Sequence, residues 1–200
     1  MRSYGALYKR IILSLGGNAI IRRGERGEIE EQFGNARRAV EFIARTSLSG
    51  ASVIITHGNG PVVGNILIRN EAARNIIPPM PLYICDADSE GGIGFMLQQS
   101  LYNQLKKAGA QKHVVTVVTQ SVVRKDDPAF EKPAKPIGPY YTKKEAGEIS
   151  AREAVHMMED SGRGYRRVVP SPKPISIVEA PVIKMLSEAG VIVIAGGGGG

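Results

Sequence analysis

Three glycine-rich segments of this sequence have the composition of anion-binding turns. They are Gly16-Gly17-Asn18, His57-Gly58-Asn59-Gly60-Pro61 and the final run from Gly196 to Gly200. Glycine lets the backbone approach a phosphate closely, and a helix that follows the turn directs N–H groups and its positive dipole end at the anion. A single turn of this kind often uses glycine only for its geometry. Three such turns at one edge of a sheet favour an anion site.

Two further segments place a cation beside proline and glycine. Lys135 opens the stretch Lys135-Pro136-Ile137-Gly138-Pro139, and Arg166 lies within a second basic stretch that begins at Ser161. Rigid neighbours would hold such a cation where negative charge accumulates, and the alternative is an ordinary solvated basic surface. His57 is either a ligand or base, or a side chain that bonds the turn. With no metal-ligand spacing around it and with Cys85 alone, no metal site is predicted.

The common nucleotide-binding motifs are missing from the sequence. No G-x-x-x-x-G-K-[ST] segment occurs, which excludes a P-loop enzyme. Gly58, Gly60 and Gly64 are spaced one residue too widely for the dinucleotide fingerprint, and no acidic residue ends the next strand. A dehydrogenase is therefore disfavoured.

The turns need elements to position them, and the hydrophobic pattern predicts an alternation of strands and helices. Apolar runs predict strands at 10–15, 51–56, 113–119 and 191–195. Helices are predicted at 28–46, 61–75, 92–107 and 180–189. Asp88 or Ser89 is the expected cap of the third helix. Because the strands lack period-two alternation, we expect an α/β fold with a mainly parallel sheet covered on both faces. The carboxyl edge of that sheet would gather the three turns.

The pattern changes between residues 121 and 175, where prolines interrupt it and charges become dense. Only residues 142–158 are compatible with a helix, and Thr142 and Glu145 have the spacing of a capping box. We interpret this segment as an excursion from the sheet, a small subdomain or lid, and not as a linker.

Composition excludes several other classes. The 200 residues carry a formal net charge of +7 and are 42% hydrophobic, which is typical of a soluble globular chain. No apolar run approaches the roughly 18 residues of a membrane span, and the N-terminus lacks the pattern of a signal peptide. The basic residues are scattered and tryptophan is absent, so we expect neither nucleic-acid nor membrane partners. A single cysteine suits the reducing cytoplasm.

These segments resemble the carbamate kinases, a branch of the amino-acid kinase superfamily. The resemblance rests on the first two glycine turns, on Gln98-Gln99, on Lys135-Pro136-Ile137-Gly138-Pro139 and on the long stretch from Asp160 to Pro172, in order from about Lys9 onwards. It implies an open αβα sandwich in which residues 121–175 form a protruding subdomain and residues 1–120 and 176–200 form the lobe that binds the acid substrate and the phosphate. It also implies reversible phosphoryl transfer between ATP and carbamate, with Mg²⁺ held mainly by the nucleotide, and a homodimer.

The resemblance also assigns roles to particular residues. Gly16, Gly17 and Asn18 would line the phosphate that is transferred, His57, Gly58, Asn59 and Gly60 would form a second wall, and Gly197 and Gly198 would close the third turn. Lys135 would reach the phosphoryl group from the subdomain. Arg166 would either capture an anion or hold the subdomain in place.

The sequence departs from the family in ways that leave alternatives open. Gly196 stands where the family usually has serine, and Asp88-Ser89-Glu90-Gly91-Gly92 replaces a segment that often carries tryptophan. The family also continues into a C-terminal nucleotide-binding lobe, so we expect this chain to be the N-terminal two-thirds of such an enzyme and to be inactive alone. Another acid kinase and a non-catalytic anion-binding module are the alternatives.

Overall fold

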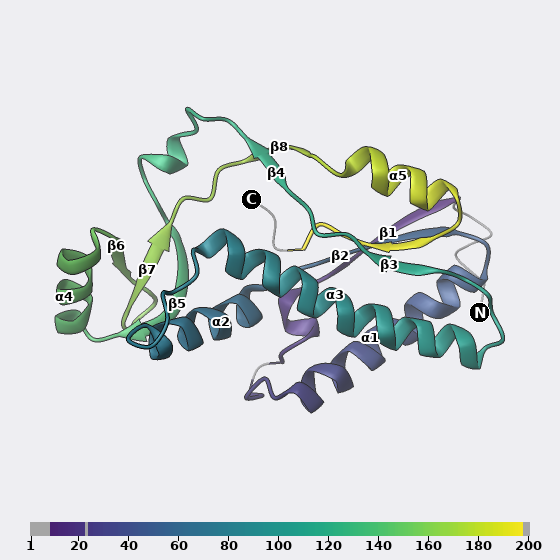
Figure 1. Cartoon of the computed structure of the whole chain (residues 1–200), viewed down its shortest axis with the longest axis horizontal. Helices are drawn as coiled ribbons and strands as arrows, with labels where there is room; N and C mark the ends of the chain where they lie inside the picture. The colour runs from purple at the N-terminus through teal and green to yellow at the C-terminus, as the bar shows by residue number, and fades with distance from the viewer. Residues whose placement is uncertain (1–8, 23, 198–200) are drawn as a thin grey trace.

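The computed structural model describes residues 9–22 and 24–197, and its central element is a four-stranded sheet (Figure 1). Its strands are β1 (Arg10–Leu15), β2 (Ser52–His57), β3 (Val114–Thr116) and β9 (Ile192–Ile194). They lie in the order β1-β2-β9-β3, and every neighbouring pair is parallel. The predicted α/β class with a mainly parallel sheet is confirmed.

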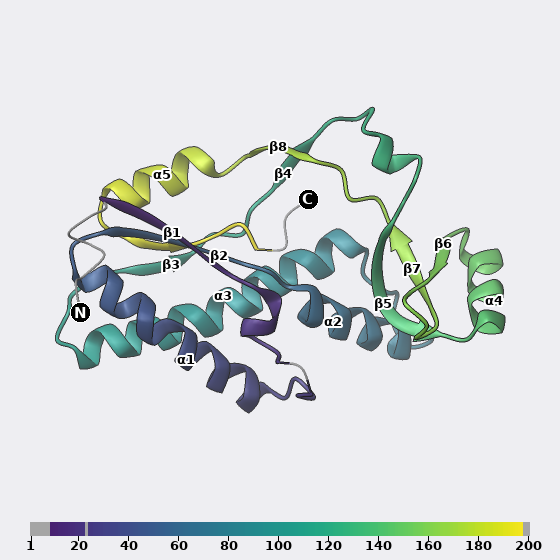
Figure 2. The ribbon, with the colours of Figure 1, turned by 180° about the vertical axis from the view of Figure 1, so that it is seen from behind.

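Two long helices cover one face of this sheet and a short helix lies on the other (Figure 2). The long ones are α1 (Ile29–Leu48) and α3 (Leu82–Lys107), and the short one is α5 (Ala180–Glu188). The main core lies under the long pair, and its fully buried side chains include Ile20, Val40, Ile55, Leu97, Leu101 and Ile194. Burial of these side chains contributes most of the free energy that holds the sheet to its helices.

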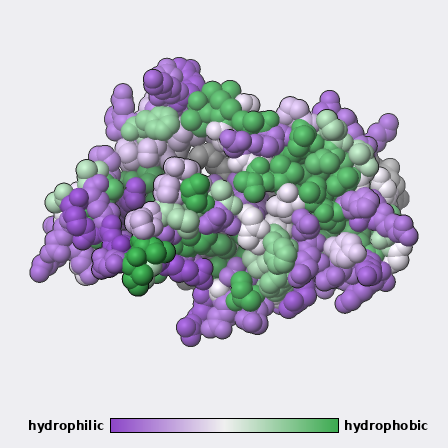
Figure 3. Space-filling view, viewed as in Figure 1, coloured by the Kyte–Doolittle hydropathy of each residue, from purple (hydrophilic) through white to green (hydrophobic). Residues whose placement is uncertain are grey.

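The second face of the sheet is only partly covered within the described residues, which corrects the expectation of two covered faces. Ile12 of β1 is 65% exposed and Met185 of α5 is 64% exposed. Figure 3 shows apolar side chains gathered over α5 and the neighbouring strands, whereas hydrophilic ones predominate at the opposite end. Helix α5 has nine residues, which is too short to shield all of the strands.

Helix α3 begins ten residues earlier than the pattern indicated. Pro81 is its N-cap, so the prediction that Asp88 or Ser89 caps this helix is wrong. Two adjacent glycines at 91 and 92 concealed the continuous helix, because glycine weakens the helical signal. A further glycine has a structural purpose, since a Cβ on Gly94 would lie 2.8 Å from Oγ1 of Thr116. The helix thus approaches β3 closely.

The chain between the third and fourth predicted strands contains strands that the prolines concealed. An antiparallel sheet has the order β5-β7-β6, formed by β5 (Lys135–Tyr141), β7 (Tyr165–Val169) and β6 (His156–Glu159). Strand β5 is at the edge, where proline is tolerated because one side of the strand needs no partner. Two shorter strands, β4 (Ser121–Val123) and β8 (Pro174–Ile177), pair antiparallel and connect this sheet to the main one.

Two helices link this antiparallel sheet to the rest of the chain. Helix α4 (Lys143–Glu153) has the predicted capping box but ends five residues before the predicted end at 158, and its C-cap Ala154 has φ of 51°. Helix α2 (Gly60–Ala73) packs against β5 and α3. Arg74, at the C-cap of α2, pairs with Glu153 of α4 at 2.5 Å. In the described part of the chain, no helix has the length and apolar character needed to cross a bilayer.

Candidate active site

The first two glycine turns pack against each other at the carboxyl ends of β1 and β2. The N–H of Gly58 donates to the carbonyl oxygen of Leu15 over 2.8 Å. A Cβ on Gly58 would lie 2.9 Å from the backbone nitrogen of Gly17, and a Cβ on Gly17 would lie 3.0 Å from Cδ of Pro61. The contact therefore requires glycine at position 58, because the backbone nitrogen of Gly17 cannot give way without moving its turn, whereas a side chain at position 17 would require Pro61 to shift by a few tenths of an ångström.

The third turn reaches the same place from β9. Gly196 has φ of +68°, a conformation that favours glycine. A Cβ on Gly197 would collide with the imidazole of His57 and would lie 3.0 Å from Cγ of Glu90. The three turns therefore meet at one edge of the sheet, as far as Gly197. Gly198, which was also predicted, lies outside the described residues.

Helix α2 begins directly after the second turn, and its N-cap is Asn59. An asparagine in this position commonly accepts hydrogen bonds from the first N–H groups of the helix. Here its amide instead donates to Oδ1 of Asp86 and Oγ of Ser89, each over 2.6 Å, and makes no cap hydrogen bond. The positive end of the helix is thus left to another acceptor, and an anion suits it.

A cleft of about 910 Å³ lies between helices α2 and α3 on one side and strands β5 and β7 on the other. Its volume suits a small phosphorylated molecule. Four predicted site residues line it, namely Asn59, Gly60, Lys135 and Arg166. The other predicted residues within the described chain form the turns and do not line it: Gly16, Gly17, Asn18, His57, Gly58 and Gly197. Lys135 is exposed on the β5 side.

His57 is the last residue of β2 and is only 4% exposed. Burial lowers the pKa of its imidazole below the ordinary value of 6.5, so the ring is neutral at pH 7. Its Nδ1 atom lies 3.4 Å from the carbonyl oxygen of Gly58. The sequence left His57 as either a ligand or base, or a side chain that bonds the turn, and this geometry favours the second role.

Glu90 is a residue that sequence reasoning named only as part of an unusual segment. It lies on α3, is 3% exposed and lines the cleft. Its Oε2 accepts hydrogen bonds from the backbone N–H and the hydroxyl of Thr119, at 2.8 and 3.2 Å. Burial raises the pKa of its carboxyl to about 6. The available sequence signal was an acidic residue directly before two glycines and an apolar helical stretch.

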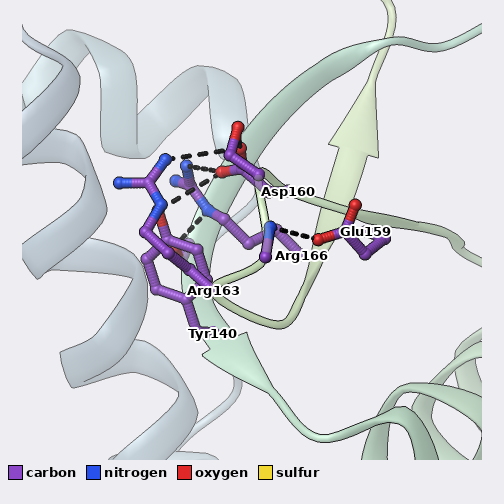
Figure 4. Close-up of polar contacts among 8 residues, drawn as sticks. Tyr140, Glu159, Asp160, Arg163 and Arg166 are labelled. Carbon is purple, nitrogen blue, oxygen red and sulfur yellow. Dashed lines mark hydrogen bonds and ion pairs between the residues drawn. The ribbon is translucent and has the colours of Figure 1, made fainter.

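A cluster of charged and aromatic side chains holds β5 against β7 beside the cleft (Figure 4). Arg166 donates from Nε to the carbonyl oxygen of Gly138 over 3.1 Å and from Nη1 to Oδ2 of Asp160 over 3.2 Å. Its guanidinium carbon lies 5.1 Å from the centroid of the Tyr140 ring, which Arg163 approaches at 5.0 Å. The hydrogen bond from Arg166 holds the pKa of Asp160 below its ordinary value. Because the guanidinium of Arg166 already bonds Asp160 and the carbonyl oxygen of Gly138, the arrangement favours positioning over anion capture.

The chemistry of the site points to anion binding by backbone groups and a lysine. Within residues 9–22 and 24–197, no three His, Cys, Asp or Glu side chains are grouped so as to hold a metal ion. Fold and site together define an α/β protein whose three glycine turns meet at the carboxyl edge of a parallel sheet, the place where such folds usually bind their ligands. The chain belongs to the amino acid kinase family, whose model matches residues 9–200.

Curated relatives and solved structures agree with this assignment. The carbamate kinase of Pyrococcus furiosus is 49% identical over 194 residues, which cover 96% of this chain and 62% of that protein. The carbamate kinase of Thermococcus kodakarensis is 49% identical over 195 residues with the same coverage. The structure of carbamate kinase from Giardia lamblia bound to AMP-PNP matches with a TM-score of 0.89 and 42% identity, over 96% of this chain and 61% of that one. The chain thus spans about three fifths of the length of these relatives.

Proposed function

We propose that the protein is a carbamate kinase, which transfers a phosphoryl group reversibly between ATP and carbamate. The observation that carries this proposal is the cleft itself, where the start of α2 and its glycine turn face Lys135 across a space suited to a small phosphorylated anion. The names of the relatives support the same reaction. In the direction of ATP synthesis, the bond between phosphorus and the carbamate oxygen breaks and a bond to the terminal phosphate oxygen of ADP forms.

The residues of the chain would act by position and charge. Gly16, Gly17 and Asn18, with the turn at 57–60 and the third turn at Gly197, would surround the phosphoryl group with backbone N–H groups. Phosphoryl transfer needs this kind of positioning and charge neutralisation more than covalent help from the protein. Lys135 would supply the mobile cation that neutralises charge as the group moves. Arg166 would act as a positioning residue for β5, because it bonds the carbonyl oxygen of Gly138.

Further parts of the proposal concern cosubstrate and organisation. ATP and ADP are the proposed nucleotides, in agreement with the AMP-PNP bound to the Giardia lamblia relative. Mg²⁺ would be held mainly by the nucleotide phosphates, since the described residues offer no grouped metal ligands. Residues 121–175 would form the protruding subdomain on the lobe made by 1–120 and 176–200. We also propose a cytoplasmic homodimer.

The test is ATP formation from carbamoyl phosphate and ADP by the natural gene product. Turnover with carbamate, and none with acetylglutamate or phosphonates, is the expected result. Preference for one of those acids would identify a different kinase of the same family. Binding of carbamoyl phosphate without any turnover would instead favour a non-catalytic anion-binding module.

A further inference from the structure

Among the described residues that line the cleft, the proposed reaction leaves one buried ionisable group without a role. Glu90 projects from α3 and is 3% exposed, yet it lines the same cleft as Gly60 and Lys135. Its Cγ lies so close to the third turn that a Cβ on Gly197 would be 3.0 Å away. Glu90 therefore lies where the proposed anion site and the third glycine turn meet.

The carboxyl of Glu90 has hydrogen-bonding capacity left on one oxygen. Its Oε2 accepts from the backbone N–H of Thr119 at 2.8 Å and from the hydroxyl at 3.2 Å. Among the residues that the structure describes, its Oε1 has only a long contact of 3.4 Å with the same hydroxyl. A carboxyl oxygen can accept two hydrogen bonds or, when protonated, donate one. Oε1 is therefore available to a bound molecule.

The surroundings of Glu90 disfavour a negative charge. The charged groups that act on it most are two other carboxyls, Asp86 one turn earlier on α3 and Glu179 just before α5. The imidazole of His57, on the other side of Gly197, is neutral because it is buried. Lys135 is on the β5 wall of the cleft and is assigned to the phosphoryl group. A second anion bound beside an ionised Glu90 would meet strong repulsion.

We propose that Glu90 binds the acid substrate in its protonated form and donates a hydrogen bond from Oε1 to a carboxyl oxygen of carbamate, or to the carbonyl oxygen of carbamoyl phosphate. The proton comes from the solvent and is taken up when the substrate binds. This inference rests on the proposed function, because it names the contact that the carbamoyl group of the substrate would make. Glu90 would then be a substrate-binding residue rather than a structural one.

The ionisation of the free protein makes this coupling measurable. Because burial raises the pKa of Glu90 to about 6, about a tenth of the molecules carry the proton at pH 7. Binding in the protonated form then takes up about 0.9 proton at this pH. For the same reason, the apparent Kd rises about tenfold between pH 7 and pH 8.

The experiment is calorimetric titration of the natural gene product with carbamoyl phosphate at pH 7 in buffers of different ionisation enthalpy. We expect the observed enthalpy to vary with the buffer by an amount that corresponds to about 0.9 proton. Glu90→Gln keeps an acceptor for Thr119 and a donor for the substrate. It should bind about tenfold more tightly than the wild type at pH 7, with no buffer dependence. Glu148→Gln, which alters an exposed carboxyl of α4, is the matched control and should behave as wild type.

The outcomes separate this inference from the proposed function. Binding whose enthalpy is independent of the buffer would overturn the role of Glu90 while leaving the proposed function intact, and this result needs no variant. Weaker binding by Glu90→Gln would show that the substrate needs an ionised carboxylate, which also overturns the inference. Failure of the wild type to bind carbamoyl phosphate at all would overturn the proposed function, and the inference with it.

Discussion

Replacing Gly58 by alanine should disrupt the contact between the first two glycine turns. The added Cβ would lie 2.9 Å from the backbone nitrogen of Gly17, whereas ordinary contacts of this kind begin near 3.4 Å. One turn must therefore move by about half an ångström, because neither partner is a flexible side chain. Overpacking of this kind costs about 1–3 kcal/mol of stability. It also strains the hydrogen bond of 2.8 Å from Gly58 to Leu15.

The same displacement should reduce catalysis more than stability. A shift approaching 1 Å at a site that works by positioning costs about a hundredfold in rate, so half an ångström should lower kcat/KM about tenfold or more. The assay is ATP formation from carbamoyl phosphate and ADP by the natural gene product, with urea denaturation run in parallel. Gly147→Ala is the control, because a Cβ there meets no atom within 4 Å. It should leave kcat/KM unchanged and raise stability by up to about 1 kcal/mol.

The reasoning fails if Gly58→Ala retains both its kcat/KM and its stability. That result would mean that the two turns are not in backbone contact. A loss of stability with normal kcat/KM would mean that the contact between the turns stabilises the fold but does not contribute to catalysis. Equal losses for the Gly58 and Gly147 variants would show that the effect of alanine is not steric.

Three further predictions concern single side chains. Lys135→Ala should lower kcat by about 10²–10³-fold while leaving the urea midpoint unchanged, because it removes only the charge that neutralises the phosphoryl group. Normal turnover of this variant would show that Lys135 does not act in the active site. Arg166→Ala should raise KM about tenfold and cost about 1–2 kcal/mol of stability, because it removes one donor of Asp160 and the side-chain donor to the carbonyl oxygen of Gly138. Arg163→Ala, at a more exposed position, should do less, and equal effects would contradict the positioning role. The folded-state pKa of Glu90 is raised, so its ionisation destabilises the fold as the pH rises from 4.5 through 6. Glu90→Gln should therefore be more stable than wild type at pH 7, by at most about 2 kcal/mol, and the advantage should vanish below pH 4.5 in urea titrations.

Local patterns in the sequence were sufficient wherever one segment decides its own structure. The strand at residues 10–15 was predicted with its observed bounds, because a short apolar run between turn residues has few alternatives. The capping box of Thr142 and Glu145 is also present, since it depends on four consecutive residues. The α/β class followed from the alternation of such segments.

Contacts between distant segments decided what the sequence left open. Local pattern cannot show that β5, with its prolines, pairs with β7, because an edge strand is recognised only once its neighbour is known. The need for glycine at position 94 likewise depends on the close approach of α3 to Thr116 of β3.

The candidate site divides in the same way. The sequence by itself determined the three glycine turns and Lys135, because their residue types carry the chemistry of anion binding. Only the tertiary structure decided that Glu90 is buried beside the third turn and that Asp160 pairs with Arg166. Burial and ion pairing arise when elements far apart in the chain meet, and they set the charge state of a side chain. The residue type alone does not fix that state.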